Sequence, residues 1–291
     1  MKKSRLAKVI TLGLAAVMAL GLAGCGNSGG SSDSGDNGIT VISREEGSGT
    51  RDAFTELTGV LQDDVDKTVD TAEISNSTSV VLQSVTDNPK AIGYVSLGSL
   101  DDSVKALKVD GTEPSVDTVK SGDYKLQRPF NIVTKGKVKE LPQDFIDYIM
   151  SADGQKIIEK EGYISEAKGA KAYKASGLKG TITLAGSTSV APVMEVLADN
   201  YKKLNDGVEI EIQQTGSGAG IQSTIEGVCD IGMASRELKD TELSEGLKAQ
   251  VIATDGIAVI VNKNSTIDEL SSDQVKSIYT GETLTWDEVA K

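Results

Sequence analysis

Ser-Arg-Glu-Glu-Gly-Ser-Gly-Thr-Arg, residues 43–51, lies between the apolar run Ile39–Ile42 and the helix-like stretch Asp52–Leu57. This pattern predicts a strand, a short loop and a helix. Glycines let the loop turn several backbone N–H groups toward one point, and the start of the helix adds a partial positive charge. The hydroxyl groups of Ser48 and Thr50 provide further donors. We therefore expect this loop to bind a tetrahedral oxyanion.

Two further segments repeat this design. Residues 182–190 read Ile-Thr-Leu-Ala-Gly-Ser-Thr-Ser-Val, and residues 208–221 read Val-Glu-Ile-Glu-Ile-Gln-Gln-Thr-Gly-Ser-Gly-Ala-Gly-Ile. Each passes from a strand-like pattern through a loop with glycine and hydroxyl side chains into a helical pattern. Three such loops predict one anion that is held from several sides. Along the chain, strand-like and helix-like segments alternate, which predicts an α/β fold.

The N-terminus has the pattern of a bacterial lipoprotein signal peptide. A basic start is followed by the apolar run Val9–Leu22, and residues 22–25 read Leu-Ala-Gly-Cys. We expect residues 1–24 to be removed and Cys25 to carry the lipid. A transmembrane anchor is the alternative, but the apolar run is short for a bilayer. Residues 25–38, rich in Gly and Ser, are expected to form a flexible tether to the outer face of the cell membrane.

The composition excludes several classes of function. The net charge is −13, and removal of the signal peptide, with its four basic and no acidic residues, takes it to −17. Such a chain is a poor partner for nucleic acids. The absence of histidine excludes imidazole metal sites and Ser-His-Asp catalysis. Besides Cys25 the chain has only Cys229, for which we expect a buried apolar role, and we predict no intrachain disulfide, no metal and no cofactor.

Six segments resemble the phosphate-binding component of ABC-type phosphate uptake systems. They are SREEGSGTRDAF (43–54), AIGYVSLGSL (91–100), ADGQKIIEKEGY (152–163), AGSTSVAPVMEVLADNY (185–201), QQTGSGAGIQSTIEGVCDIGMASRELKD (213–240) and DGIAVIVN (255–262). The resemblance implies a periplasmic-binding-protein-like fold of type II, in which two α/β lobes enclose a ligand cleft. It also implies a monomeric, non-enzymatic protein that binds inorganic phosphate and delivers it to a membrane permease.

The order of these segments differs from the order in that family. There, AGSTS comes first, and SREEGSGTR follows the sequence IYTGETLTWDEV, which here ends the chain at residues 278–289. The chain therefore resembles a circular permutant, in which residues 164–180 link the family's usual ends. Such permutation is tolerated where the old termini are close and the new ones fall in an exposed loop. A truncated tandem duplication and an error of sequence assembly are the alternatives.

The permuted order predicts one split lobe and one continuous lobe. Residues 39–98 and 262–291 would form the split lobe, and residues 99–261 the continuous lobe. We expect the long apolar segment Val251–Val261 to run from one lobe to the other, and the return connection to lie near Ser99–Val109.

Two local predictions accompany this division. Ile39 should lie next to the end of the chain, Trp286–Lys291, on the surface of the split lobe. The linker of residues 164–180 carries little apolar mass and should add nothing to the core.

The resemblance also implies which residues bind phosphate. Arg44 would supply a two-pronged charged clamp. The other implied donors are Ser48, Gly49 and Thr50 in the first loop, Thr188 and Ser189 in the second, Ser217 in the third, and Ser235. From the residues alone, the hydroxyls could equally be helix caps, the glycines an ordinary turn, and Arg44 a surface ion-pair residue. The glycine spacing fits neither a dinucleotide-binding motif nor a P-loop.

One position departs from the family pattern. Arg236 stands where many relatives have a carboxylate that accepts the proton of phosphate. The acceptor must then lie elsewhere, and Asp255 and Glu46 are the candidates. Glu46 is also expected to pair with Arg44, as an acid near this position does in the family.

This departure keeps binding of another oxyanion, namely sulfate, molybdate or arsenate, open as an alternative. A sensor or surface-adhesion role without transport is a separate alternative that the sequence does not distinguish from transport. A buried carboxylate favours phosphate over sulfate because sulfate has no proton to share with it. A serine hydrolase that uses Ser48 or Ser217 is a further alternative, but neither serine lies in a Gly-x-Ser-x-Gly elbow and the chain has no histidine.

Overall fold

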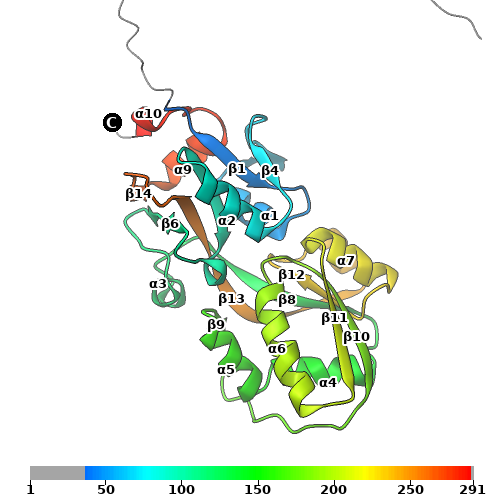
Figure 1. Cartoon of the computed structure of the whole chain (residues 1–291). Coiled ribbons are helices and arrows are strands. Elements are labelled where there is room, and N and C mark those ends of the chain that lie inside the picture. The colour runs from blue at the N-terminus through cyan, green and yellow to red at the C-terminus, as the bar shows by residue number, and fades with distance from the viewer. Residues whose placement is uncertain (1–36, 290–291) are drawn as a thin grey trace, which may run out of the picture. The chain divides into compact units, whose positions relative to one another are not determined.

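The computed structural model describes residues 37–289. The expected signal peptide, Cys25 and nearly all of the tether lie outside these residues. The described chain forms a long mixed sheet with the strand order β11-β10-β12-β8-β13-β5-β1-β4, together with two small two-stranded sheets (Figure 1). Within residues 37–289, none of the helices combines the length and the apolar character needed to cross a membrane.

The first lobe, which we call the β1 lobe, is built on parallel strands. Strand β1 (Thr40–Arg44) lies between β4 (Glu73–Ser75) and β5 (Ala91–Ser96) and is parallel to both. The other elements of this lobe are α1 (Gly49–Thr58), β2 (Leu61–Gln62), β3 (Val65–Asp66), α2 (Thr78–Asp87), η1 (Leu97–Ser99), β6 (Val104–Ala106), β7 (Lys108–Val109), α3 (Val116–Ser121), β14 (Glu269–Leu270), α9 (Ser272–Tyr279) and α10 (Trp286–Val289).

The second lobe, which we call the β10 lobe, repeats the design. Strand β10 (Gly180–Gly186) lies between β11 (Val208–Gln214) and β12 (Ile231–Ala234) and is parallel to both. Its other elements are α4 (Glu140–Ile149), α5 (Ala152–Lys160), β9 (Ile164–Ser165), α6 (Ala191–Leu204), α7 (Ser217–Glu226) and α8 (Asp240–Ser244). Helix α6 begins as expected, with proline in its first turn, where a missing N–H leaves no helical bond unmade.

Two antiparallel strands connect the lobes. Strand β13 (Leu247–Asn262) pairs with β8 (Gln127–Lys135) over its first part and with β5 from Ile257 to Val261. Figure 1 shows both strands passing between the two groups of elements. The prediction that Val251–Val261 runs from one lobe to the other is confirmed.

Each lobe has its own hydrophobic core. In the β1 lobe, Phe54 stacks on Tyr94 with ring centroids 3.9 Å apart, and both pack against Tyr279. In the β10 lobe, α4 and α6 bring Phe145 and Tyr201 together, with ring centroids 5.0 Å apart. These two cores hold the loops at the carboxyl ends of β1 and β10 in fixed positions.

The return connection between the lobes is not where we expected it. Leu107 and Leu126, at either end of segment 104–126, pack in the core of the β1 lobe. The next large apolar residue, Phe130, already belongs to the core of the β10 lobe. The prediction of a connection near Ser99–Val109 is therefore wrong, and the chain crosses at the start of β8.

The reason lies in strand pairing that the sequence pattern does not reveal. Strand β6 pairs with the end of β13, and β7 pairs with β14, so this segment completes the β1 lobe before the chain leaves it. The packing favours a β1 lobe of residues 37–126 and 257–289 and a β10 lobe of residues 128–255. With these revised bounds, the division into a split lobe and a continuous lobe stays a prediction.

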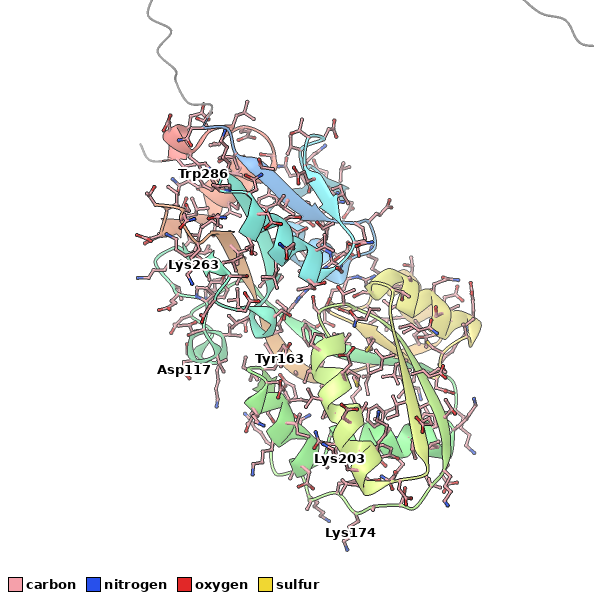
Figure 2. All side chains as sticks on the ribbon, in the orientation of Figure 1. Asp117, Tyr163, Lys174, Lys203, Lys263 and Trp286 are labelled. Atoms are coloured by element: carbon pink, nitrogen blue, oxygen red, sulfur yellow. The ribbon has the colours of Figure 1, made fainter. Side chains whose placement is uncertain are left out.

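The two ends of the described chain lie together, as predicted. The N–H of Ile39 donates to the carbonyl of Leu284 at 2.8 Å, and the N–H of Trp286 donates to the carbonyl of Asn37 at 3.0 Å. Figure 2 labels Trp286 close to the start of β1. This closeness is what a circular permutant requires, and the permutation itself stays a prediction.

The linker of residues 164–180 contributes both a short strand and a side chain that packs on the core of the β10 lobe. Its first residues form β9, which pairs with β13. Tyr173 packs against the core of the β10 lobe, and its hydroxyl donates to Asp144 at 2.6 Å. The expectation that the linker adds nothing to the core is wrong, because one aromatic side chain anchors it.

Candidate functional site

The first loop of the site follows directly from strand β1. A turn at residues 45–48 is closed by the N–H of Ser48, which donates to the carbonyl of Glu45 at 3.1 Å. Gly47 has φ 81°, a left-handed conformation that glycine adopts without strain. The Ser48 hydroxyl then caps α1 by accepting from the N–H of Arg51 at 3.4 Å. The turn therefore aims the start of α1 at the junction between the lobes.

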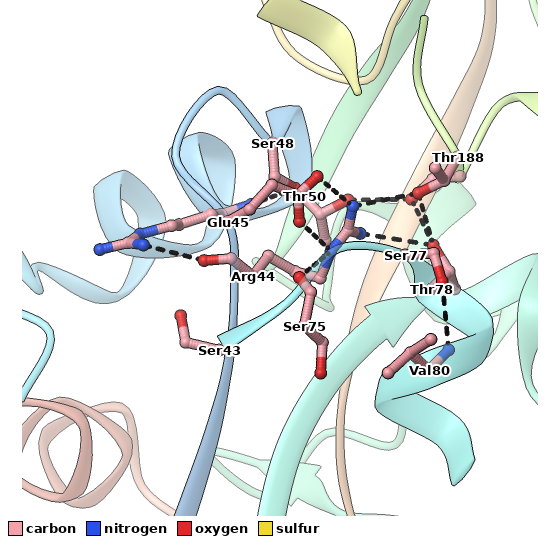
Figure 3. Close-up of polar contacts among 12 residues, drawn as sticks. Ser43, Arg44, Glu45, Ser48, Thr50, Ser75, Ser77, Thr78, Val80 and Thr188 are labelled. Atoms are coloured by element: carbon pink, nitrogen blue, oxygen red, sulfur yellow. Dashed lines mark hydrogen bonds and ion pairs between the residues drawn. The ribbon is translucent and has the colours of Figure 1, made fainter. Parts of the chain in front are cut away.

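Arg44 is held in place by an acid on its own loop. Its side chain is only 2% exposed. Nε and Nη2 donate to the two carboxylate oxygens of Glu45 at 2.8 Å each, and Nε also donates to the carbonyl of Ser75 at 3.2 Å. This leaves the outer edge of the guanidinium directed at the other lobe, where Nη2 lies 3.1 Å from the hydroxyl oxygen of Thr188 (Figure 3).

The partner of Arg44 is thus Glu45, and the expected pairing with Glu46 is wrong. Glu46 is exposed at the tip of the turn. The turn that places Ser48 at the start of α1 carries Glu46 away from the guanidinium, whereas Glu45 still lies next to the strand end.

Hydroxyl groups from both lobes meet in front of Arg44. We call this set the buried hydroxyl cluster; it consists of Thr50 and Thr78 of the β1 lobe and Ser187, Thr188, Ser189, Ser217 and Ser235 of the β10 lobe. All seven side chains are buried. The cluster is connected across the lobes, because the hydroxyl oxygens of Thr50 and Ser189 lie 2.9 Å apart.

Glycine is required where the loops of the two lobes touch. A Cβ on Gly49 would lie 2.4 Å from the hydroxyl oxygen of Ser217 and 2.8 Å from that of Ser235. The N–H of Gly218, at the start of α7, donates to the carbonyl of Gly47 at 2.9 Å. A side chain at position 49 would therefore force Ser217 and Ser235 of the facing lobe to shift.

The structure thus brings together most of the residues expected at the site. Arg44, Gly49, Thr50, Thr188, Ser189, Ser217 and Ser235 lie at the junction of the lobes, and the Ser48 hydroxyl is used as a helix cap beside it. Four helix starts also meet there, those of α1, α2, α6 and α7, and helix starts favour negative charge. The arrangement presents many N–H and O–H donors and a guanidinium to one point.

Asp255 is linked to the buried hydroxyl cluster through one residue, Arg128. It is 1% exposed, and its carboxylate accepts from Ser96 at 2.9 Å and from Arg128 at 3.2 and 3.1 Å. Arg128 in turn donates to the backbone carbonyl of Ser235 at 3.2 Å. Burial raises the pKa of Asp255 to about 6, although Arg128 opposes the rise. This buried pair joins the two connecting strands, β8 and β13, and contacts the hydroxyl cluster through the carbonyl of Ser235.

Arg236 points away from the hydroxyl cluster. Its guanidinium makes two bonds of 2.8 Å to Glu242 in its own lobe and one of 2.8 Å to Asp52 of α1 in the other lobe. Burial opposes its charge, but Glu242 and Asp52 outweigh this effect and raise its pKa. The side chain that replaces the expected carboxylate is therefore neutralised by two acids and joins the lobes at the edge of the site.

Sequence reasoning missed three members of the site, Glu45, Thr78 and Arg128. Thr78 follows β4, a strand of three residues that is too short to show a periodic pattern. A signal for it does exist, because Ser-Thr-Ser-Val at residues 77–80 repeats residues 187–190. Within residues 37–289, no group of three or more acidic or cysteine side chains is placed to hold a metal ion.

Comparison with known proteins agrees with this geometry. A family model described as a PBP superfamily domain matches residues 27–153 and 171–291. Over 298 residues that cover the whole of both chains, the sequence is 53% identical to the phosphate-binding protein PstS 2 of Streptococcus agalactiae. The chain belongs to the PstS family.

Other PstS proteins extend this similarity. The phosphate-binding protein PstS 2 of Streptococcus pneumoniae is 46% identical over 287 residues, which cover 97% of this chain and 98% of that one. A crystal structure of a phosphate-binding protein of a phosphate ABC transporter from Streptococcus pneumoniae has a TM-score of 0.69 and 48% identity, and covers 87% of this chain and 99% of that one. The two-lobed PBP-like α/β fold is thus that of the PstS family.

The comparison also bears on the order of the segments. Since the alignment with the streptococcal PstS 2 protein runs over the whole of both chains, that relative has its segments in the same order. An error of sequence assembly therefore does not explain the order. Permutation and partial duplication remain predictions about how it arose.

Proposed function

We propose that this chain captures inorganic phosphate between its two lobes and delivers it to an ABC-type phosphate permease. The observation that carries the proposal is Arg44, buried and fixed by Glu45, facing a cluster of hydroxyl groups from both lobes. PstS relatives named as phosphate-binding proteins support the choice of ligand.

The chemistry of the site suits a tetrahedral oxyanion. Hydrogen bonds between a guanidinium or hydroxyl donor and a charged oxygen are stronger than those between neutral groups, and more so in a buried site. The donors come from both lobes, so an anion between them would favour the closed arrangement. The proposed ligands are Arg44, Ser48, Gly49, Thr50, Thr188, Ser189, Ser217 and Ser235.

Asp255 and Glu46 remain the proposed acceptors of the phosphate proton, and the geometry favours one of them. Asp255 is buried behind Ser235, whereas Glu46 is exposed at the tip of its turn. Burial raises the pKa of the Asp255 carboxyl, so this group accepts a proton at a higher pH than an ordinary aspartate does.

The rest of the proposal concerns the setting of the protein. We propose a monomer on the outer face of the cell membrane, anchored by lipid on Cys25, with residues 25–38 as the tether. We also propose that it binds without catalysis. This agrees with the relative described as the binding protein of a phosphate ABC transporter.

Equilibrium dialysis of the full-length protein with radiolabelled phosphate tests the proposed function. We expect saturable binding of one phosphate per chain, displaced by arsenate and only weakly by sulfate or molybdate. Equal displacement by sulfate would assign the site to oxyanions in general. No saturable phosphate binding would contradict the proposal.

A further inference from the structure

Thr78 has a hydroxyl group that helix capping does not explain. It is the first residue of α2, and its side chain is only 6% exposed. The cap of this helix is Ser77, whose side chain accepts from the N–H of Val80 at 3.3 Å. The hydroxyl of Thr78 is therefore free to make contacts outside its own helix.

The contacts of Thr78 all lie in the proposed phosphate site. Its hydroxyl oxygen lies 3.3 Å from those of Thr188 and Ser189 in the other lobe, and Nη1 of Arg44 lies 3.5 Å away (Figure 3). Each of these three partners is a proposed ligand of the anion. Thr78 thus occupies the middle of the donor set.

The position of Thr78 follows from the sheet. Strand β4 is parallel to β1, with Ser75 opposite Arg44 at the strand ends. The carboxyl ends of two adjacent parallel strands lie at the same edge, so the loop after β4 opens beside the loop that carries Arg44. This makes β4, residues 76–77 and α2 a fourth strand–loop–helix unit at the site.

A four-residue repeat links Thr78 to its counterpart across the junction. Residues 77–80 and 187–190 both read Ser-Thr-Ser-Val. In both, the first serine accepts from the N–H of the valine at 3.3 Å, Ser77 from Val80 and Ser187 from Val190. In each lobe the first serine of the turn makes this bond, so the threonine hydroxyl is not needed for it. The hydroxyl oxygens of Thr78 and Thr188 lie 3.3 Å apart.

We propose that the hydroxyl of Thr78 binds the same anion as Thr188, so that two matching Ser-Thr-Ser-Val turns hold it from opposite lobes. The proposal rests on the proposed function of this site. In the loaded protein, the Thr78 hydroxyl donates to an anion oxygen in place of its contacts with Thr188 and Ser189. Thr78 is then a further ligand of the anion, because its hydroxyl can donate to an anion oxygen.

Calorimetric titration of the full-length protein with phosphate, for three variants beside the wild type, tests this role. Thr78→Val keeps the shape of the side chain but removes the hydroxyl, and we expect it to weaken phosphate binding about tenfold or more. Thr78→Ser keeps the hydroxyl and should stay within about threefold of the wild type. Ser79→Ala, on the exposed side of the same turn, is the matched control and should bind as the wild type does.

The outcomes separate this inference from the proposed function. Wild-type affinity in Thr78→Val, or an equal loss in Thr78→Val and Thr78→Ser, overturns the role of the hydroxyl while phosphate binding by the wild type stands. If the wild type binds no phosphate, the proposed function itself fails. Should Thr78→Val not fold, a crystal structure of the phosphate-loaded wild type decides. The Thr78 oxygen must lie within about 3.2 Å of an anion oxygen, and a separation beyond about 3.5 Å overturns the proposal.

Discussion

Arg44 is buried, and its own loop holds its charge in a fixed orientation. The two bonds to Glu45 fix the plane of the guanidinium, and the carbonyl of Ser75 supports it from behind. A guanidinium that is already ordered loses less conformational entropy when it binds an anion. Glu45 therefore orients the guanidinium, although its own negative charge near the site disfavours a bound anion.

Gly49 provides a prediction about the fit between the lobes. Gly49→Ala should weaken phosphate binding about tenfold or more, because the added Cβ would lie 2.4 Å from the Ser217 oxygen and overpacking of this kind costs on the order of 1–3 kcal/mol. Calorimetric titration measures the loss. Gly207→Ala is the control, since its added Cβ meets only the flexible side chain of Lys179. Unchanged affinity in Gly49→Ala would show that the lobes do not close around this point.

Asp255 provides a prediction about pH. Burial raises its pKa from 3.8 to about 6 in the folded protein, so its stabilising contribution is complete below about pH 4 and is lost as the pH rises through 6. The free energy of unfolding of the wild type should therefore fall between about pH 4 and pH 6 relative to Asp255→Asn, which lacks this titration. Urea unfolding of both proteins across this range measures the difference. Parallel pH profiles would contradict the raised pKa.

At the scale of elements, the ion pair between Arg236 and Asp52 joins α1 to the other lobe. Asp52→Asn leaves Arg236 its two bonds to Glu242 but removes the negative charge of Asp52, and with it the ion pair across the junction. We expect phosphate to dissociate about two- to fivefold faster, the range for a partly exposed ion pair, with a smaller effect at high salt. Stopped-flow displacement measures the rate.

The control for this prediction is an ion pair within one lobe. Asp268→Asn removes the ion pair of Asp268 with Lys105. Both residues belong to the β1 lobe, so this pair does not join the lobes. Its dissociation rate should equal that of the wild type. A rate in Asp52→Asn that matches the wild type would show that this pair does not hold the closed arrangement.

The sequence predicted those elements whose signal is local. The strand–loop–helix units at β1–α1, β10–α6 and β11–α7 are each marked by an apolar strand, a glycine loop and a periodic helix, and all three are present. The unit at β4–α2 was missed because a strand of three residues has no readable period. The anchoring of Tyr173 was missed because it depends on Asp144, which is distant in sequence.

At the scale of the whole molecule, long-range pairing limited what could be predicted. The crossing strand β13 is a long apolar run and was found, whereas the return at the start of β8 depends on the pairing of β6 with β13 and of β7 with β14. Such pairs have no signature in either strand alone. The pairing of Arg44 with Glu45 rather than Glu46 was equally hidden, because the shape of a four-residue turn decides it.

In the proposed site, donors from both lobes hold one phosphate. Calorimetric titration of the full-length wild type beside Arg44→Ala and Thr188→Val, one variant in each lobe, tests this arrangement. Each variant should lose at least about tenfold in phosphate affinity, or ~1.4 kcal/mol, while its thermal unfolding changes little. Wild-type affinity in either variant would place the phosphate on a single lobe, or at another site, and would rule out binding between the lobes.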